Sequence, residues 1–250
     1  MQGNEKFIIT DTRRNNHNEK NRIIGVGIMG KSMVRNLMKA GFELHIYART
    51  RSKVEDVISE GAIFHETIAD CVKDCDAVIT IVGFPVDVEE VYFDKGNILD
   101  SAKEGAYLID MTTTSPMLDQ KIAEEGTKRG FRVLDAPVTG GDTGAKAGTL
   151  SILVGGSRED YEACIPLFKA MGTNINYQGA AGNGQHAKLA NQIMIAGTLS
   201  GVCEALTYAK AKGWICRRYL TPYRPGQLEV NSWTHSDQRS WQEIMHRDSS

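Results

Sequence analysis

Hydrophobic positions along the chain alternate between short continuous runs and runs with helical spacing. A continuous apolar run predicts a strand at 77–82, shorter strands are predicted at 22–25 and 43–47, and helical spacing predicts helices at 31–40 and 54–60. The same alternation continues through 88–92, 106–110, 116–129, 132–135 and 151–154. Strands and helices that alternate with short links are typical of a parallel sheet covered on both faces. The pattern therefore predicts an α/β fold with a Rossmann-type, doubly wound and mostly parallel sheet.

A glycine turn joins the first predicted strand to the first helix. It has the spacing G-x-G-x-x-G, in which the first glycine makes the turn, the second admits a pyrophosphate and the third packs helix on strand. The helix that follows would direct its unpaired N–H groups at the phosphates. The alternative is a purely structural role, as a tight strand-to-helix turn that binds no ligand. If the turn binds a dinucleotide, the predicted cofactor-binding residues are Gly25, Val26, Gly27, Ile28, Met29 and Gly30.

The segment after the second strand indicates which dinucleotide would bind. An acidic residue there would hold the ribose of NAD, but the chain reads Tyr-Ala-Arg-Thr-Arg-Ser-Lys over 47–53. Arg49 and Thr50 would instead suit the 2′-phosphate of NADP, because a guanidinium forks onto phosphate oxygens. NADP is the preferred prediction, with NAD second. A solvated basic helix start is the alternative.

Two further segments carry polar groups where a parallel sheet binds ligands. Residues 110–116 end a predicted strand, so the hydroxyls there would lie in the ligand crevice, although Ser115 could simply cap the next helix. Residues 135–150 form a glycine-rich segment between two predicted strands. Its backbone N–H groups and the Thr139 hydroxyl could hold a carboxylate. A mobile hairpin loop is the alternative for the second segment.

A long helix is predicted from Gln185 to Lys212, roughly 40 Å long at 1.5 Å per residue. Lys188 and Asn191 are three residues apart, so their side chains are neighbours on the helix surface. Glycines at 179, 182 and 184 precede them and allow a ligand or backbone to approach closely. A Lys and an Asn at this spacing are ordinarily solvated surface residues. The upstream glycine motifs instead favour a role for this pair in a functional site.

Composition excludes several classes of function. The 250 residues carry a net charge of −2, so nothing suggests a nucleic-acid or acidic-membrane partner, and no apolar run approaches a membrane span. The five cysteines include no Cys-x-x-Cys pair and no histidine at ligand spacing, which predicts no metal site. We expect reduced thiols in a cytoplasmic protein with a small-molecule partner.

Four motifs in the same order resemble the β-hydroxyacid dehydrogenases, the group of 3-hydroxyisobutyrate dehydrogenase and tartronate semialdehyde reductase. They are Gly-Val-Gly-Ile-Met-Gly at 25–30, Asp-Met-Thr-Thr at 110–113, and the segments 135–150 and 179–191. The resemblance implies cofactor contacts from Val82, Gly83 and Thr113, although 83–90 departs from the family's commoner Leu-Pro form. It implies further that Lys188 is the catalytic lysine with Asn191 beside it, and that the substrate carboxylate is held by Thr139, Gly140 and Gly141.

The implied reaction transfers a hydride between NAD(P) and a small β-hydroxyacid or its semialdehyde, with Lys188 as general acid and base. An intact family member would be a homo-oligomer. Two alternatives stay open: a module that binds cofactor but is catalytically impaired, and another dehydrogenase such as the 6-phosphogluconate type. The latter would need several cations for the substrate phosphate, and no such set lies near Thr139 or Lys188 in the sequence.

The resemblance spans about 24–213 and suggests four segments. Residues 1–21 are an atypical extension, 22–178 the Rossmann domain with the substrate segment, and 179–213 the interdomain helix that starts a truncated all-α C-terminal domain. Residues 214–250 are an atypical tail. A shifted reading of possible codons for 241–250 spells the family's Gly-Asp-aromatic-x-Pro-Gly-Phe-Phe segment, which suggests a changed reading frame after about Gly213. We therefore expect a chain that binds cofactor but turns over weakly.

Overall fold

The computed structural model describes residues 20–213, and within that range nine strands form one sheet. The strand order is β3-β2-β1-β4-β5-β6-β8-β7, and β9 pairs with β8. The first six strands in that order are parallel, and β8 runs antiparallel to β6 and β7. The strands are β1 (Lys20–Ile24), β2 (Glu43–Tyr47), β3 (Ile63–Phe64), β4 (Ala77–Thr80), β5 (Tyr107–Asp110), β6 (Arg132–Asp135), β7 (Val138–Thr139), β8 (Leu150–Gly156) and β9 (Gly172–Gly179).

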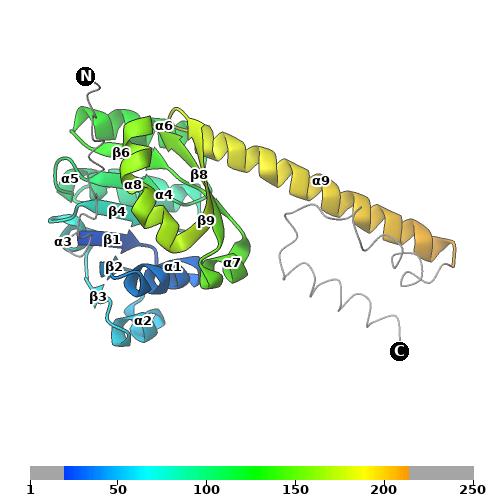
Figure 1. Ribbon diagram of the computed structural model, residues 1–250, viewed down its shortest axis with the longest axis horizontal. Helices are drawn as coiled ribbons and strands as arrows, with labels where there is room; N and C mark the ends of the chain where they lie inside the picture. The colour runs from blue at the N-terminus through cyan, green and yellow to red at the C-terminus, as the bar shows by residue number, and fades with distance from the viewer. Residues whose placement is uncertain (1–19, 214–250) are drawn as a thin grey trace, which may run out of the picture.

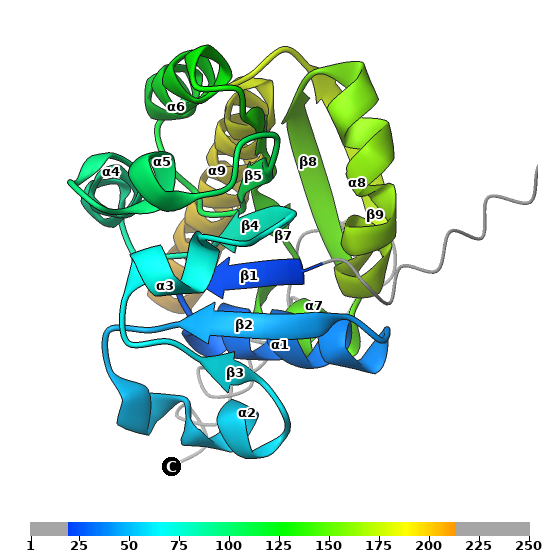
Figure 2. The same cartoon turned by 90° about the vertical axis from the view of Figure 1, so that its left-hand side faces the viewer.

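Helices connect the strands and cover both faces of the sheet, as Figure 1 and Figure 2 show. They are α1 (Ile28–Lys39), the 3₁₀ turn η2 (Arg51–Lys53), α2 (Glu55–Ser59), α3 (Ile68–Val72), α4 (Pro85–Phe93), α5 (Ile98–Ser101), α6 (Pro116–Lys128), α7 (Gly141–Ala147), α8 (Arg158–Met171) and α9 (Asn183–Ala211). The predicted α/β fold with a doubly wound, mostly parallel sheet is confirmed.

Successive residues of the central strands enter different hydrophobic cores. Ile23 and Ile79 pack with buried residues of α1 and α8, whereas Ile24 and Val78 pack with those of α3, α4 and α5. This alternation follows from the two-residue period of a strand, which points neighbouring side chains to opposite faces. The central strands are therefore largely buried on both faces, and their carboxyl ends meet at one edge of the sheet.

Three local predictions differ from the structure. Strand β1 begins at Lys20, two residues before the predicted start and inside the segment assigned to the extension. The glycine-rich segment 135–150 is not a loop throughout, because α7 forms within it. Helix α8 and strand β9 were not predicted. Apart from Lys20 and Asn21, the extension 1–21 and the whole tail 214–250 lie outside the described residues.

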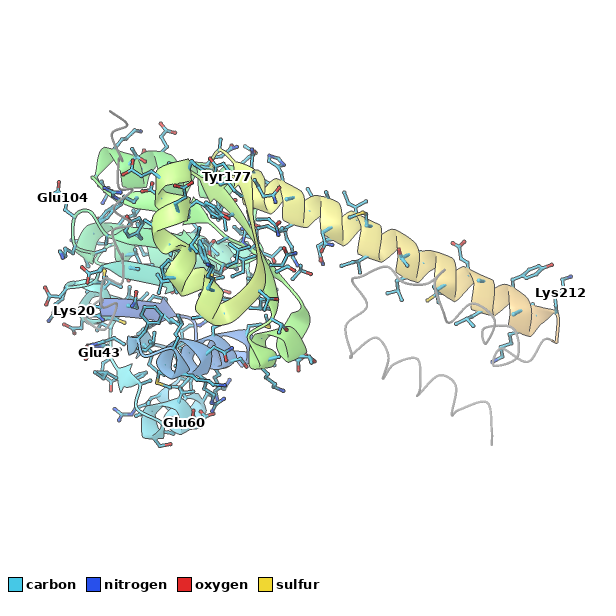
Figure 3. The ribbon with its side chains drawn as sticks, in the orientation of Figure 1. Lys20, Glu43, Glu60, Glu104, Tyr177 and Lys212 are labelled. Carbon is cyan, nitrogen blue, oxygen red and sulfur yellow. The ribbon has the colours of Figure 1, made fainter. Side chains whose placement is uncertain are left out.

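Helix α9 runs from the edge of the sheet out of the body of the molecule (Figure 1). Figure 3 shows Tyr177 of the sheet near the start of α9 and Lys212 at its far end. Between them, the side chains of α9 project away from the sheet. Large apolar residues of this stretch are exposed, among them Ile193 at 64% and Met194 at 59%. By length and composition alone α9 could cross a membrane, with a mean hydropathy of 1.2 over 18 residues, contrary to the sequence-based expectation. A single helix of this kind is a weak indication of a membrane span, because helices of soluble proteins can have the same length and composition.

Candidate active site

The glycine turn between β1 and α1 has the geometry that a dinucleotide requires. Gly25 adopts a φ of +96°, and a Cβ there would overlap the carbonyl oxygen of Ile81. A Cβ on Gly30 would likewise overlap the carbonyl oxygen of Gly25. Gly27 differs, because a Cβ there would have no described atom within 4 Å. Two of the glycines thus let the backbone pack tightly, and Gly27 opens onto free space at the start of α1, where a pyrophosphate fits.

A cavity of about 440 Å³ lies in front of this turn. One end is the glycine turn itself, and the other is the segment after β2 that includes Arg49, Thr50 and Lys53. Residues of α4 close a further side. The predicted cofactor residues from 25 to 30, together with Arg49, Thr50, Val82 and Gly83, all line this cavity. The structure therefore brings those predicted cofactor residues together.

Arg49 is joined to a carboxylate that the sequence did not indicate. Its Nη1 atom donates to Asp87 Oδ1 at 3.0 Å, while its side chain remains 70% exposed. The other oxygen of Asp87 accepts the backbone N–H of Phe84 at 2.9 Å, which fixes Asp87 at the start of α4. Asp87 is 38 residues from Arg49 in sequence. No local pattern could have paired them, since only the β2 to α4 packing does so.

A second cavity, of about 420 Å³, adjoins the first and shares Met29, Ile81, Val82 and Gly83 with it. Lys188 is the only charged side chain among the described residues that line it. The other predicted residues found there are Thr113, Thr139, Gly140 and Gly141. The cofactor turn, the glycine-rich segment and the start of α9 thus converge on one space, although they are far apart in sequence.

Lys188 lies at the boundary of this cavity with only 8% of its surface exposed. Its Nζ atom donates to the carbonyl oxygen of Val138 at 2.8 Å. Within residues 20–213 it forms no ion pair with a carboxylate. Desolvation by burial lowers the pKa of Lys188 below its ordinary value of 10.5, because the interior disfavours the charged ammonium. A lysine in this state can exchange a proton nearer neutral pH than a surface lysine can.

The glycine-rich segment contributes backbone to the same cavity, next to the Val138 carbonyl that Lys188 contacts. Thr139 belongs to β7, which is fixed by pairing with β8 at Ser151. Gly140 and Gly141 follow with φ angles of +123° and +61°, a conformation that favours glycine, and α7 starts there. The first N–H groups of a helix have no partner within it, so they are available to an anion. These residues can therefore bind a carboxylate facing Lys188.

The residues beside Lys188 on α9 differ from the sequence-based expectation. Asn191 does not line the cavity, and its Oδ1 atom is buried without a hydrogen bond to any described residue. Gln192 and Ile195 line the cavity instead. They lie four and seven residues after Lys188, the spacing of one helix face. Asn191, three residues after Lys188, also has a neighbour spacing, so the sequence alone could not have singled out Gln192.

A series of hydrogen bonds connects three of the segments around this cavity. The hydroxyl of Thr112 accepts the N–H of Val82 at 3.0 Å, and the carbonyl of Thr112 accepts Gln185 Nε2 at 2.7 Å. Gln185 is almost fully buried and lies one turn before Lys188. Gln185 therefore ties the start of α9 to the segment that follows β5. Sequence reasoning missed it because a single Gln carries no pattern.

Comparison with known proteins identifies the fold's family. The NAD binding domain of 6-phosphogluconate dehydrogenase matches residues 22–179. An uncharacterized oxidoreductase of Bacillus subtilis, YkwC, is 53% identical over 214 residues, covering 86% of this chain and 74% of its own length. The chain belongs to the β-hydroxyacid dehydrogenase family. As a member of this family it is an oxidoreductase that contains a nicotinamide-dinucleotide-binding domain of the Rossmann type.

Two other β-hydroxyacid dehydrogenases extend the comparison. A probable 3-hydroxyisobutyrate dehydrogenase-like protein of Arabidopsis thaliana is 42% identical over 81% of the chain. The solved structure of Mycobacterium tuberculosis 3-hydroxyisobutyrate dehydrogenase with L-serine matches with a TM-score of 0.77 and 27% identity, over 86% of this chain and 74% of that one. The chain spans 61% of the length of the Arabidopsis relative.

Proposed function

We propose that this protein transfers a hydride between NADP(H) and a small β-hydroxyacid or its semialdehyde, with 3-hydroxyisobutyrate as the nearest substrate type. The observation that carries the proposal is the position of Lys188. Its buried amine faces the cavity that joins the dinucleotide turn to the Thr139–Gly141 backbone. This position supports a role for Lys188 in proton transfer between the proposed cofactor and carboxylate sites, which is the arrangement that hydroxyacid oxidation needs.

The chain's own residues supply binding and proton transfer. A bound nicotinamide dinucleotide supplies the hydride acceptor or donor. Lys188, in its neutral form, takes the proton of the substrate hydroxyl as the carbon loses its hydride, and in the reverse direction the ammonium returns that proton to the developing alkoxide. Thr139, Gly140 and Gly141 hold the carboxylate and so fix which hydroxyl reaches Lys188. We assign Asn191 to orienting Lys188 or the substrate oxygen, and Gln192 as a further polar contact.

Arg49 and Thr50 support the preference for NADP over NAD. Within the part of the chain that the structure describes, the Arg49 guanidinium bonds Asp87 through Nη1 alone, and the side chain is largely exposed beside the cofactor cavity. A guanidinium has five N–H donors, so it can retain Asp87 and still bind a phosphate. The aspartate also holds Arg49 near the cavity mouth. The proposed Arg49 contact is therefore with the 2′-phosphate.

Hydroxyacid-dependent reduction of NADP⁺ by a panel of short acids tests the proposal. The panel compares 3-hydroxyisobutyrate, glycerate, L-serine and 6-phosphogluconate, each with the full chain and with Lys188→Ala. We expect turnover with at least one of the three unphosphorylated acids and its loss in the variant. Faster turnover with 6-phosphogluconate than with any of those acids would overturn the substrate assignment. Parallel Asn191→Ala and Gln192→Ala variants show which side chain beside Lys188 contributes.

The 6-phosphogluconate alternative is disfavoured by the charge of the cavity. A phosphorylated sugar acid would require several cations, whereas Lys188 alone is charged among the described lining residues. The other alternative, a module that binds cofactor without catalysis, makes a separate prediction. It would bind NADPH yet show no turnover with any acid of the panel.

A further inference from the structure

Three buried aspartates surround the point where α9 leaves the sheet. Asp110 ends β5, Asp119 lies in α6 and Asp135 ends β6, and each is at most 3% exposed. Within the described residues, no lysine or arginine hydrogen-bonds or ion-pairs with any of them. Buried carboxylates without a cation are costly, since the interior disfavours their charge. Their hydrogen bonds must therefore reveal which of them are ionised.

Asp135 has the partners of an ionised carboxylate. Its Oδ1 atom accepts the N–H of Gly182 at 2.7 Å, and its Oδ2 atom accepts the N–H of Gln185 at 3.0 Å. Both donors belong to the start of α9, where helix N–H groups lack partners and favour a negative charge. Asp135 therefore caps α9, and no proton is needed to satisfy its oxygens.

Asp110 and Asp119 are in a different situation. Asp110 Oδ1 accepts the hydroxyl of Thr80 at 2.7 Å and the N–H of Thr112 at 3.0 Å. Asp110 Oδ2 and Asp119 Oδ2 are buried and have no donor among the described residues. The two carboxyl groups nonetheless lie within hydrogen-bonding reach of each other. Two ionised carboxylates can only accept, so this contact requires a proton between them.

We propose that Asp119 is a neutral carboxylic acid that donates its proton to Asp110, and that this acid pair is a positioning element for the start of α9. The proton supplies a donor to a pair of carboxyl groups whose oxygens would otherwise only accept. It also removes the repulsion that two like charges would have at this separation in a dry site.

The groups around the pair support this protonation state. Tyr92 of α4 approaches through Thr80, whose hydroxyl lies 3.0 Å from the Tyr92 oxygen, and burial raises the Tyr92 pKa. Asp135 approaches from β6 and Gln185 from α9. None of these groups is positive. Burial first, and then the charges of Asp110 and Asp135, raise the pKa of Asp119, so the proton remains on it at neutral pH.

The pair reaches the candidate catalytic lysine through Gln185. Asp110 Oδ1 accepts the N–H of Thr112 at 3.0 Å, and the carbonyl of the same Thr112 is hydrogen-bonded to the Gln185 side chain. That side chain donates to the Thr112 carbonyl at 2.7 Å and accepts the N–H of Thr114 at 3.1 Å. Lys188 follows Gln185 by three residues on the same helix. The shared proton thus fixes the helix turn that carries Lys188, without touching substrate or cofactor. Only its consequence for catalysis rests on the proposed function.

Carbon-13 labelling of the aspartate carboxyls in the full chain tests the protonation state. Between about pH 5 and pH 8, where an ordinary aspartate of pKa about 3.9 is ionised, we expect one carboxyl resonance at the position of a neutral acid. It should be absent in Asp119→Asn and present in Asp74→Asn, a control at an exposed position of the same residue type. Carboxylate positions for every aspartate over this range would overturn the proposal.

Linkage to folding gives a second, activity-free readout. A neutral acid in the folded state binds one proton more than the unfolded chain above about pH 4, so the folding equilibrium constant should fall tenfold per pH unit from this group. Asp119→Asn removes that proton. Its folding constant relative to the parent chain should therefore rise by up to tenfold per pH unit, and the Asp74→Asn ratio should stay constant. An unchanging ratio for Asp119→Asn would contradict the shared proton.

Hydrogen exchange tests the positioning role separately. An amide side chain can donate to Asp110 as the neutral acid does, so Asp119→Asn should keep the exchange rates of the Gly182 and Gln185 N–H groups. Asp119→Ala should speed that exchange at least tenfold, while an N–H within α1 is unaffected. Equal rates in parent, Asn and Ala variants would exclude the positioning role. Since neither readout needs turnover, failure of the proposed reaction would leave both results interpretable.

Discussion

The amine of Lys188 donates to the main-chain carbonyl of Val138, 50 residues earlier, over 2.8 Å. Val138 lies in β7, next to Thr139 of the substrate segment. One hydrogen bond therefore links the start of α9 to the backbone proposed to hold the carboxylate. Because the acceptor is a neutral carbonyl, it orients the amine without the strong stabilisation of the ammonium that a carboxylate would give.

Replacing Lys188 by Met should change how stability depends on pH. The folded-state pKa of Lys188 is lowered by burial, so below that pKa the folded chain carries the full cost of a buried charge. The cost fades as pH rises towards the unfolded value of about 10.4. The free energy of unfolding of Lys188→Met, relative to the parent, should thus be highest at low pH and decline by about 1.4 kcal/mol for each unit by which the pKa is lowered.

Chemical unfolding at a series of pH values measures this difference. Lys146→Met is the matched control, since Lys146 is 68% exposed and its side chain is not buried by folding. The contrary result is a free energy of unfolding of Lys188→Met, relative to the parent, that is as independent of pH as that of Lys146→Met. That result would show that Lys188 has the same pKa in the folded and unfolded chain.

Arg49→Gln should weaken NADPH binding and leave NADH binding nearly unchanged. A charge-assisted hydrogen bond contributes about 1.5–3 kcal/mol, which corresponds to roughly a 10- to 150-fold loss of affinity. Titration with each cofactor, followed by fluorescence or calorimetry, gives the two dissociation constants. Arg51→Gln is the control, because Arg51 already pairs with Glu55 and Glu66 on the surface. Equal affinity of the parent chain for both cofactors, or tighter NADH, would refute the NADP preference.

The glycines of the turn should separate binding from folding. Gly27→Ala should keep the stability of the parent within about 0.5 kcal/mol, because the added methyl meets no described atom. It should nevertheless weaken NADPH binding at least about tenfold, since the methyl occupies the space assigned to the pyrophosphate. Gly30→Ala should destabilise the fold by about 1–3 kcal/mol through overlap with the Gly25 carbonyl.

Thermal unfolding without ligand and NADPH titration distinguish the two variants. Near-parental cofactor affinity in a folded Gly27→Ala chain would place the pyrophosphate elsewhere. A Gly30→Ala chain as stable as the parent would contradict the close packing of α1 on β1.

The parts of the fold that follow from local physics could be predicted from the sequence. The strand at 43–47 buries alternate residues, the apolar strand at 77–80 is buried on both faces, and the turn at Gly25 is set by its backbone conformation. Helix α8 escaped prediction because Pro166 lies inside it. Strand β9 escaped because most of its residues are partly exposed and show no alternation.

The candidate site was predictable only where a motif marks it. Gly27 and Lys188 stand in recognisable segments, and the structure places both at adjoining cavities. Asp87 and Asp119 gave no signal, because their partners come from distant strands and helices. The contrast between Asn191 and Gln192 was equally hidden, since both lie within one helical turn of Lys188. Which of them lines the cavity depends on the rotation of α9 against the sheet.

We propose above all that Lys188 transfers the substrate proton. Comparing Lys188→Ala with the parent chain tests it most directly, through turnover with the best acid of the panel and the dissociation constant of NADPH, with Lys146→Ala as control. We predict a loss of turnover of about 10²- to 10⁴-fold with NADPH affinity nearly unchanged. The opposite result is a Lys188→Ala chain that binds NADPH as the parent does and keeps more than about a tenth of its turnover. A loss that small is less than a general acid or base contributes, and it would contradict the proposal.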